Sequence, residues 1–285
     1  MADAPGWVQA LVLGVVQGLA EFIPVSSSGH LVLVPALAGW ERHGLAFDVA
    51  LHVGTLAALV VYYRRDLWGI VRALFGRPTV AESAVHRRLA VLLLTASVPV
   101  AVAGLVLGEV VEAVFASPVA AAWLLFVTAG VLVGGERLHR RRTDGSRTVT
   151  ATSAATDDAG GAGRIGWRQA LLVGVAQMFA LLPGLSRSGL TISAGIAAGL
   201  PRPLATRFAF LLGLPAIAGA ALVQIPQLGG GVQVSPVELT VGVVAAAGSG
   251  YLAIALLVRL VSRVGIDRFA WYLVPVAALA LWVLR

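Results

Sequence analysis

Long apolar runs recur along the whole chain and are separated by short segments rich in arginine or glycine. A helix needs roughly 17–25 predominantly apolar residues to cross a bilayer. Six runs reach or approach that length, and each predicts a transmembrane helix. They cover residues 46–63, 87–108, 119–135, 203–223, 237–260 and 269–284. The pattern therefore predicts an all-α integral membrane protein with about six transmembrane helices.

Two further apolar regions, 7–40 and 167–200, are interrupted near their middle by proline, serine and glycine. Each half is too short to span a bilayer comfortably. Irregular backbone at membrane depth is tolerated only where protein buries it or where it lines a polar cavity. We therefore expect each region to form a re-entrant pair of half-helices with a loop at membrane depth.

The composition agrees with a membrane protein. Of the 285 residues, 58% are hydrophobic and 12% are charged, whereas a soluble domain carries about 25% charged residues. The net charge of +7 can indicate nucleic-acid binding. However, the arginines gather between apolar runs, which is how membrane proteins mark their cytoplasmic loops. We therefore expect no nucleic-acid partner. The absence of cysteine excludes disulfides and thiolate chemistry.

The placement of arginine predicts the topology. The connections 64–88 and 261–268 contain arginine and are expected in the cytoplasm, whereas 109–118 contains glutamate without arginine and is expected outside. On this topology, region 7–40 enters the membrane from outside and region 167–200 enters from inside. The repeated regions would therefore have opposite orientations.

Residues 137–166 predict a mobile cytoplasmic linker. They combine an arginine cluster with a Thr/Ala/Gly/Asp stretch that has no apolar periodicity. This linker divides the chain into a first membrane repeat, 1–136, and a second membrane repeat, 167–285.

The two broken regions are related in sequence at a constant offset of 160 residues, without a gap. Identical residues occur in both at Gly14, Val15, Gln17, Ala20, Ser26, Ser28 and Gly29. With the opposite entry of the two regions, this similarity predicts an inverted-topology repeat, in which broken helices meet near the midplane where substrate binds. The half-helix after each loop would point its N-terminus inward, which suits an anion such as phosphate.

Glu21 is an ionisable residue inside an apolar region, where a charge is costly and by default marks function. It follows Gln17 by four residues, so both lie on one helix face. We expect Glu21 to bind a metal ion or to act as acid or base, with Gln17 as a candidate second ligand. A carboxylate that only packs helices is the alternative. Gln17 and its counterpart Gln177 are also expected to support the site by hydrogen bonds.

The two loops differ where Ser27 stands in the first and Arg187 in the second. Ser27 is a candidate nucleophile, and Arg187 presents a planar fork suited to phosphate oxygens. His30 follows Ser27 by three residues and could accept a proton from a hydroxyl or a water. A packed polar histidine is the alternative for His30. Asp48 and His52, four residues apart on one predicted helix, could bind each other or support the site from behind it.

The other loop residues are candidates for binding the substrate through hydroxyl and backbone N–H groups. Turn and N-cap chemistry is the alternative for them. They are Ser26, Ser28, Gly29, Ser186, Ser188, Gly189 and Thr191.

These motifs carry a family resemblance. Gln17-x-x-x-Glu21 followed by Pro24-Val25-Ser26-Ser27-Ser28-Gly29-His30 resembles the first signature of the bacterial undecaprenyl-diphosphate phosphatases, also called bacitracin-resistance proteins. The segment from Pro183 to Thr191 resembles their second signature, and the similarity spans the whole chain. The resemblance implies hydrolysis of a C55 isoprenyl diphosphate to the monophosphate, which recycles the lipid carrier of cell-wall synthesis in the bacterial plasma membrane.

The resemblance also implies dependence on a divalent cation, Mg²⁺ or Ca²⁺. The family has Glu or Gln where Gln17 stands, and Gln supplies one anionic oxygen fewer to such a cation. Carried over, Glu21 would hold the cation, Ser27 or His30 would do the nucleophilic or base work, and Arg187 would grip the diphosphate. We expect the active site to open to the external face.

A second copy of the chain, as a homodimer, is a candidate partner. The alternative function is an inverted-repeat transporter or flippase for a polyprenyl phosphate or another anion, because broken helices in inverted repeats are a transporter feature.

Overall fold

The structure, a computed structural model, describes residues 6–41, 44–76, 80–145, 162–224 and 235–284. Every element within these residues is a helix, and no strand occurs among them. The α-helices are α1 (Gly6–Phe22), α2 (Ser27–Ala38), α3 (Leu45–Tyr62), α4 (Arg64–Phe75), α5 (Val80–Val106), α6 (Gly108–Phe115), α7 (Pro118–Gly145), α8 (Trp167–Phe179), α9 (Arg187–Ala197), α10 (Arg202–Gln224), α11 (Pro236–Leu260) and α12 (Ala270–Val283). Two short 3-10 helices cover Ala162–Arg164 and Ile266–Phe269. The prediction of an all-α chain is confirmed.

Five of the described helical segments are long and apolar enough to cross a bilayer, and they lie in α5, α7, α10, α11 and the helix that ends with α12. The pair α3 and α4 passes the same test across a bend of 75°, which brings the number to six if the pair is one span. The outer sides of these helices carry large exposed apolar side chains, for example Leu94, Trp123 and Leu252. Lipid is the solvent that suits such surfaces, so the chain is a multi-pass membrane protein.

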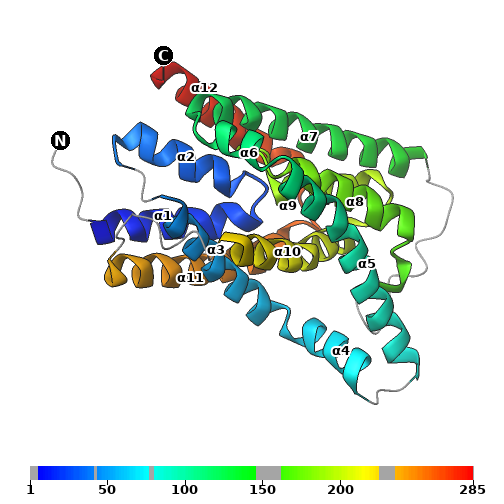
Figure 1. Ribbon diagram of the computed structural model, residues 1–285. Helices are drawn as coiled ribbons and strands as arrows, with labels where there is room; N and C mark the ends of the chain where they lie inside the picture. The colour runs from blue at the N-terminus through cyan, green and yellow to red at the C-terminus, as the bar shows by residue number, and fades with distance from the viewer. Residues whose placement is uncertain (1–5, 42–43, 77–79, 146–161, 225–234, 285) are drawn as a thin grey trace.

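The two regions expected to be broken form pairs of short helices. α1 and α2 are shorter than a bilayer span, and α8 and α9 have 13 and 11 residues. In Figure 1, α2 lies beside α1, and the two pack against each other. Proline interrupts both regions, at Pro24 and Pro183, because it lacks a backbone N–H and clashes with the preceding turn. The first loop also contains Ser26 with φ of 71°, and the second contains Gly184 with φ of 99°.

Several helix boundaries differ from the sequence prediction. α4 lies within the expected loop 64–88, and α6 lies within the expected loop 109–118. Both are too short to produce an apolar run of span length, at 12 and 8 residues. α7 continues to Gly145, into the segment assigned to the linker. Arg140 in this continuation pairs with Glu136, which precedes it by one helical turn. Residues 146–161 of the predicted linker lie outside the described residues.

Each pair of short helices packs against a long helix from the other half of the chain. α1 lies along α11, and α8 lies along α5. A Cβ on Gly14 would collide with the backbone of Gly242, and a Cβ on Gly174 would collide with the backbone of Ala96. Small residues let helix backbones approach closely in membranes. Gly14 and Gly174 are equivalent at the offset of 160 residues, so both halves use the same residue for the same kind of contact.

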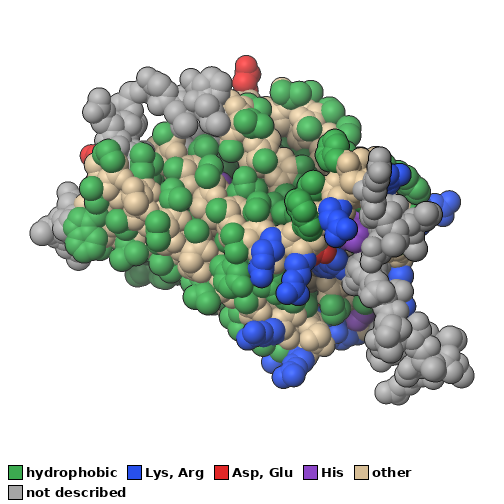
Figure 2. Space-filling model, turned by 90° about the horizontal axis from the view of Figure 1, so that it is seen from below, with side chains coloured by type: hydrophobic (Ala, Val, Ile, Leu, Met, Phe, Trp, Pro, Cys, Tyr) green, Lys and Arg blue, Asp and Glu red, His purple; other side chains and the backbone are tan. Residues whose placement is uncertain are grey.

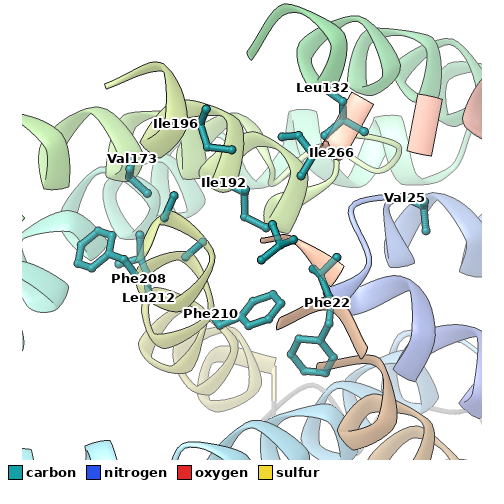
Figure 3. Packing of buried hydrophobic residues seen from close by; sticks show 14 of the residues in the cluster. Phe22, Val25, Leu132, Val173, Ile192, Ile196, Phe208, Phe210, Leu212 and Ile266 are labelled. Carbon is teal, nitrogen blue, oxygen red and sulfur yellow. The ribbon is translucent and has the colours of Figure 1, made fainter. Parts of the chain in front are cut away.

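A buried apolar cluster supports the end of α1. Phe22 of α1 and Phe210 of α10 pack edge to face with ring centroids 5.5 Å apart, as Figure 3 shows. Both side chains are fully buried, and Ile192 of α9 belongs to the same cluster. Such an aromatic pair contributes about 0.5–1.5 kcal/mol beyond its buried area. Because Phe22 directly follows Glu21, this packing also fixes the position from which Glu21 projects.

The charged surface is uneven. Figure 2 shows arginine side chains gathered toward one end of the molecule and hydrophobic side chains over much of the remaining face.

Ion pairs join the helices. The buried Glu136 of α7 pairs with Arg202 of α10, and Asp66 of α4 pairs with Arg207 of α10. These pairs satisfy charges that would be expensive to bury alone.

Candidate active site

The two loops contact each other and form one unit. The Ser26 hydroxyl accepts hydrogen bonds from the backbone N–H of Gly29, at 3.3 Å, and from the backbone N–H of Gly184, at 3.1 Å. In the opposite direction, the Ser188 hydroxyl donates to the carbonyl of Ile23 at 3.4 Å. Ser26 therefore caps α2 and holds the second loop at the same time.

Glu21 lies at the centre of this junction, on the last turn of α1, and is 6% exposed. Its Oε2 accepts hydrogen bonds from the Ser27 hydroxyl at 2.5 Å and from Gln17 Nε2 at 3.1 Å. Its Oε1 accepts a hydrogen bond from Arg187 Nη2 at 2.9 Å. His52 of α3 places Nε2 at 3.7 Å from Glu21 Oε2. The structure thus brings together the carboxylate, the hydroxyl and the guanidinium that the sequence singled out.

Arg187 is the first residue of α9, and its side chain is 13% exposed. Besides its bond to Glu21, Nη1 donates to the carbonyl of Ala209 at 3.3 Å. Its Nε is buried without a hydrogen-bond partner among the described residues. The guanidinium lies against Gly213 of α10, where an added Cβ would stand 2.7 Å from Arg187 Cζ. A buried guanidinium with an unused donor is suited to bind a further anion.

A cavity of about 240 Å³ adjoins this cluster. Its polar wall includes Glu21, Ser27, Asp48, His52 and Arg187. The lining also has an apolar part, to which α5, α6 and α10 contribute Val100, Val111, Phe115, Ile217 and Ala221. A charged group bound at the polar wall would leave an attached apolar chain in contact with the apolar wall.

The two histidines differ in their relation to the cavity. His30 points elsewhere, because Nδ1 bonds the carbonyl of Ser26 at 2.7 Å and Nε2 bonds the hydroxyl of Tyr272 at 2.9 Å. His52 lines the cavity and uses Nδ1 on the carbonyl of Asp48, at 2.7 Å. This bond makes Nδ1 the protonated nitrogen of neutral His52 and leaves Nε2, on the Glu21 side, as its acceptor. His52 is therefore better placed than His30 to exchange a proton in the cavity.

The serines and glycines shared by the loops mainly organise the backbone. Ser186 accepts from the N–H of Gly189 at 3.1 Å, so it caps α9 as Ser26 caps α2. The hydroxyls of Ser186 and Ser188 lie 3.2 Å apart, and those of Ser26 and Ser28 lie 3.4 Å apart.

The expected substrate-binding residues divide by their access to the cavity. Three line it, namely Ser26, Ser28 and Ser186. The others are absent from the described lining, namely Gly29, Ser188, Gly189 and Thr191. Thr191 donates to the carbonyl of Arg187 at 2.7 Å, inside its own helix.

Thr128 of α7 is a site residue that sequence reasoning missed. It is fully buried, its hydroxyl donates to the carbonyl of Gly184 at 2.7 Å, and it accepts from the N–H of Ser186 at 3.1 Å. These bonds satisfy two backbone groups of the second loop, just before Arg187. In the sequence, Thr128 is visible only as a hydroxyl residue inside the apolar run 119–135. Such a residue has many structural uses and does not by itself indicate its hydrogen-bond partner.

The side chains around Glu21 offer few ligands for a metal ion. Within the described residues, no group of three or more His, Asp or Glu side chains could hold one. However, Gln17 Oε1 is buried without a described partner, beside the carboxylate of Glu21. One carboxylate and one amide oxygen suit a hard cation such as Mg²⁺, which often takes its other ligands from substrate phosphates and water. The donor types at Glu21 and Gln17 therefore suit such a cation, although only Glu21 belongs to the described lining of the cavity.

Known proteins of one family resemble this chain over nearly its whole length. A family model described as "Bacitracin resistance protein BacA" matches residues 10–279. The chain is 40% identical over 275 residues to the undecaprenyl-diphosphatase 2 of Stutzerimonas stutzeri, which covers 96% of this chain and 97% of the relative. It is 42% identical over 269 residues to the undecaprenyl-diphosphatase of Geobacter metallireducens, covering 93% of each chain.

A further relative, the undecaprenyl-diphosphatase of Thermomicrobium roseum, is 41% identical over 286 aligned residues, covering 96% of this chain and 97% of the relative. The similarity therefore extends over both pairs of short helices and the long helices that hold them.

Proposed function

The chain belongs to the bacitracin resistance protein family and acts as an undecaprenyl-diphosphatase; on this premise we propose that the cluster of Glu21, Ser27 and Arg187 carries out the hydrolysis. The main support for this proposal is a continuous chain of hydrogen bonds, from the Ser27 hydroxyl through the Glu21 carboxylate to the Arg187 guanidinium. It places a nucleophile, a proton acceptor and a phosphate-binding cation around one cavity.

Arg187 binds and neutralises the diphosphate. Catalysis of phosphoryl transfer depends mostly on positioning and on stabilising the charge of the phosphoryl oxygens. The free Nε of Arg187 is available to a phosphate oxygen, and its Nη2 can exchange Glu21 for the substrate. That exchange would leave Glu21 Oε1 free while Oε2 stays on Ser27.

Ser27 attacks the terminal phosphorus in line with the bridging oxygen. The new bond joins Ser27 Oγ to phosphorus, the bond from phosphorus to the bridging oxygen breaks, and undecaprenyl phosphate leaves. The hydroxyl proton passes to Glu21 Oε2, which already accepts it in a hydrogen bond of 2.5 Å. His52 Nε2, 3.7 Å from Glu21 Oε2, takes over this proton, so that Glu21 is a carboxylate again. Water then attacks the phosphoserine and gives a proton to Glu21. The bond from phosphorus to Ser27 Oγ breaks, inorganic phosphate is released, and Ser27 Oγ takes back a proton from Glu21.

His52 serves this proton transfer in place of His30. Its Nε2 lies 3.7 Å from Glu21 Oε2 and can take over the proton that Glu21 receives. His30 instead supports α2, because both of its ring nitrogens bond the carbonyl of Ser26 and the hydroxyl of Tyr272. The role expected for His30 is thus better supported for His52.

A divalent cation, Mg²⁺ or Ca²⁺, belongs to the proposal. Glu21 Oε1 and Gln17 Oε1 would hold it. When bound, it would neutralise negative charge on the phosphate oxygens.

The cavity is proposed to open to the external face of the bacterial plasma membrane. Its apolar wall comes from α6 and from the C-terminal parts of α5 and α10. Those parts lead toward segments without arginine, 109–118 and 224–236, whereas arginines lie toward the opposite ends of the same helices, Arg87 and Arg88 in α5 and Arg202 and Arg207 in α10. The apolar wall would take the first part of the polyprenyl tail.

The crossed packing supports an inverted-topology repeat with re-entrant pairs. α1 packs on α11 as α8 packs on α5, and Ser26 and Ser186 cap equivalent helices. The homodimer stays a prediction, and the mass of the protein in detergent, measured by light scattering, tests it.

Phosphate release from farnesyl diphosphate by purified protein in detergent tests the proposal. We expect turnover by the wild type, its loss in EDTA and its return with Mg²⁺, and its loss in Glu21→Ala. The variant Glu109→Ala, which removes an exposed carboxylate, is the matched control and should remain active. Tight binding of the diphosphate without release would instead support the transporter alternative, which the names of the relatives do not favour.

A further inference from the structure

Gln177 is a buried amide that the proposed mechanism does not use. It lies on α8, is 1% exposed and lines the cavity. Neither its Nε2 nor its Oε1 has a hydrogen-bond partner among the described residues. Buried polar side chains are almost always hydrogen-bonded, so an amide with both ends unpaired needs a partner from outside the chain. The cavity is the place from which such a partner can come.

We propose that Gln177 binds the diphosphate of the substrate directly, through its amide N–H groups. This inference rests on the proposed function, because it assumes that the cavity receives a diphosphate. An amide also presents an acceptor beside its donor. It can therefore bond one ionised and one protonated oxygen of the same phosphate, which suits a hydrogen phosphate group before and after cleavage.

The comparison with Gln17 explains why Gln177 is available. The two residues are equivalent at the offset of 160, and both are buried. Gln17 donates to Glu21, which follows it by four residues. The corresponding neighbour of Gln177 is Leu181, which cannot accept a hydrogen bond. The first repeat thus ties its amide to a carboxylate, whereas the second repeat leaves its amide for a ligand.

Two N–H donors at the cavity lack partners among the described residues, and both are suited to bind an anion. Arg187 Nε and Gln177 Nε2 both lack described partners, and both residues line the cavity. A diphosphate bound in the cavity offers acceptor oxygens to donors of this kind. The neutral amide of Gln177 adds a donor to the cavity without adding a charge. Gln177 therefore extends the phosphate site that Arg187 begins.

The test compares Gln177→Met with the wild type in two measurements. The first is the KM and kcat of phosphate release from farnesyl diphosphate, and the second is the melting temperature with and without farnesyl methylenediphosphonate, which cannot be hydrolysed. Met has a similar length but no donor. We expect KM to rise about tenfold or more, as for a lost hydrogen bond to a charged group, and the shift in melting temperature caused by the analogue to shrink. The melting temperature of the free protein should stay the same or rise, because an unpaired amide is removed.

Thr206→Val is the matched control. Thr206 is fully buried, and its hydroxyl also lacks a described partner, but it does not belong to the described lining of the cavity. This variant should leave KM and the analogue-induced shift unchanged.

Two results would overturn the role of Gln177. One is a KM and an analogue-induced shift that match the wild type in Gln177→Met. The other is a fall in the melting temperature of the free variant with a full shift on adding the analogue, which is the behaviour of a structural amide.

If the Met variant does not fold, the variant Gln177→Glu provides the test, since it keeps the shape of the side chain and places a negative charge against the phosphate. Loss of the analogue-induced shift in folded Gln177→Glu supports the proposal, and a full shift opposes it. A wild type that releases no phosphate would oppose the proposed function, while the shift would still measure binding by Gln177.

Discussion

Glu21 and Arg187 stand 166 residues apart in the chain and form a buried ion pair, with 2.9 Å between Glu21 Oε1 and Arg187 Nη2. One residue comes from the helix before the first loop, and the other begins the helix after the second loop. A lone charge would be expensive at either position, so each residue makes the burial of the other tolerable. The pair therefore both joins the loops and prepares the charge of the site.

Arg187→Ala should lower kcat/KM by about 10²–10³, the scale of losing one charge-stabilising donor. It should also destabilise the protein by about 3–5 kcal/mol, because Glu21 is left buried without its partner. Phosphate release and thermal unfolding in detergent measure the two effects. The double variant Glu21→Gln with Arg187→Met should recover stability but not activity, and Arg263→Ala, at an exposed arginine, should change neither. Near-normal turnover by Arg187→Ala would contradict the proposed mechanism.

Ser27→Ala should reduce kcat by about 10³-fold or more, because the attacking oxygen is removed. In the wild type, mass spectrometry after acid quenching should find phosphoserine at position 27. Ser97→Ala is a suitable control, since the Ser97 hydroxyl donates to the carbonyl of Leu93 in its own helix and Ser97 does not belong to the described cavity lining. A normal rate in Ser27→Ala would show that water, and not Ser27, attacks the phosphorus.

His52→Gln should lower kcat more than His30→Gln does. The loss of a general base costs about 10²–10⁴-fold in rate, and His52 is the histidine that lines the cavity. His30→Gln should act mainly on stability, and Tyr272→Phe should reproduce part of that effect because it removes the bond to His30 Nε2. Parallel measurements of kcat and melting temperature separate the two roles. A larger rate loss in His30→Gln would reverse this assignment.

The sequence predicted much of the membrane architecture for identifiable reasons. The length of an apolar run reports the thickness of the bilayer, so the spans in α5, α10 and α11 lie close to their predicted limits. The span in α7 continues past its predicted end at residue 135 to Arg142. Broken helices could also be recognised, because proline and glycine act locally on the backbone. The short helices α4 and α6 were missed, since neither is long enough to produce a span-length apolar run.

The sequence predicted which residues belong to the candidate site better than it predicted what each of them does. Glu21 and Arg187 could be identified because a charge in an apolar region requires a reason. The roles of His30 and His52 could not, since the direction of each ring depends on the rotation of α2 and α3 about their axes. Thr128 was missed because its partners, Gly184 and Ser186, lie far away in the sequence.

Thr128→Val should lower activity while Thr128→Ser retains it. Valine has the same shape as threonine but leaves the carbonyl of Gly184 and the N–H of Ser186 without their partner. An unsatisfied buried group costs about 1–3 kcal/mol, and a displacement of about 1 Å at a catalytic group can cost on the order of 10²-fold in rate. We expect a fall in kcat/KM with rescue by serine, measured beside the melting temperature. Equal activity in the Val and Ser variants would show that the hydroxyl does not position Arg187.

Gly213→Ala should separate function from stability. The Cβ of alanine would occupy space held by the Arg187 guanidinium, at 2.7 Å from Cζ. Arg187 can yield by moving its flexible end, so the fold should survive. Alanine also favours a helix interior over glycine by about 1 kcal/mol, and Gly213 lies inside α10. We therefore expect the melting temperature to change little, because a guanidinium displaced by about 1 Å stays paired with Glu21. The same displacement should lower kcat/KM on the order of 10²-fold.

The same helix offers a control for the Gly213 variant. A Cβ on Gly219 of α10 would meet nothing within 4 Å, so Gly219→Ala should gain the same helix preference without a loss of phosphate release. If both alanine variants keep full activity, the space at Gly213 is not required to hold the Arg187 guanidinium in its active position. If both lose activity equally, the effect belongs to the stiffness of α10 and not to Arg187. Only a loss confined to Gly213→Ala, with its stability retained, agrees with an arginine held in place by the absence of a side chain.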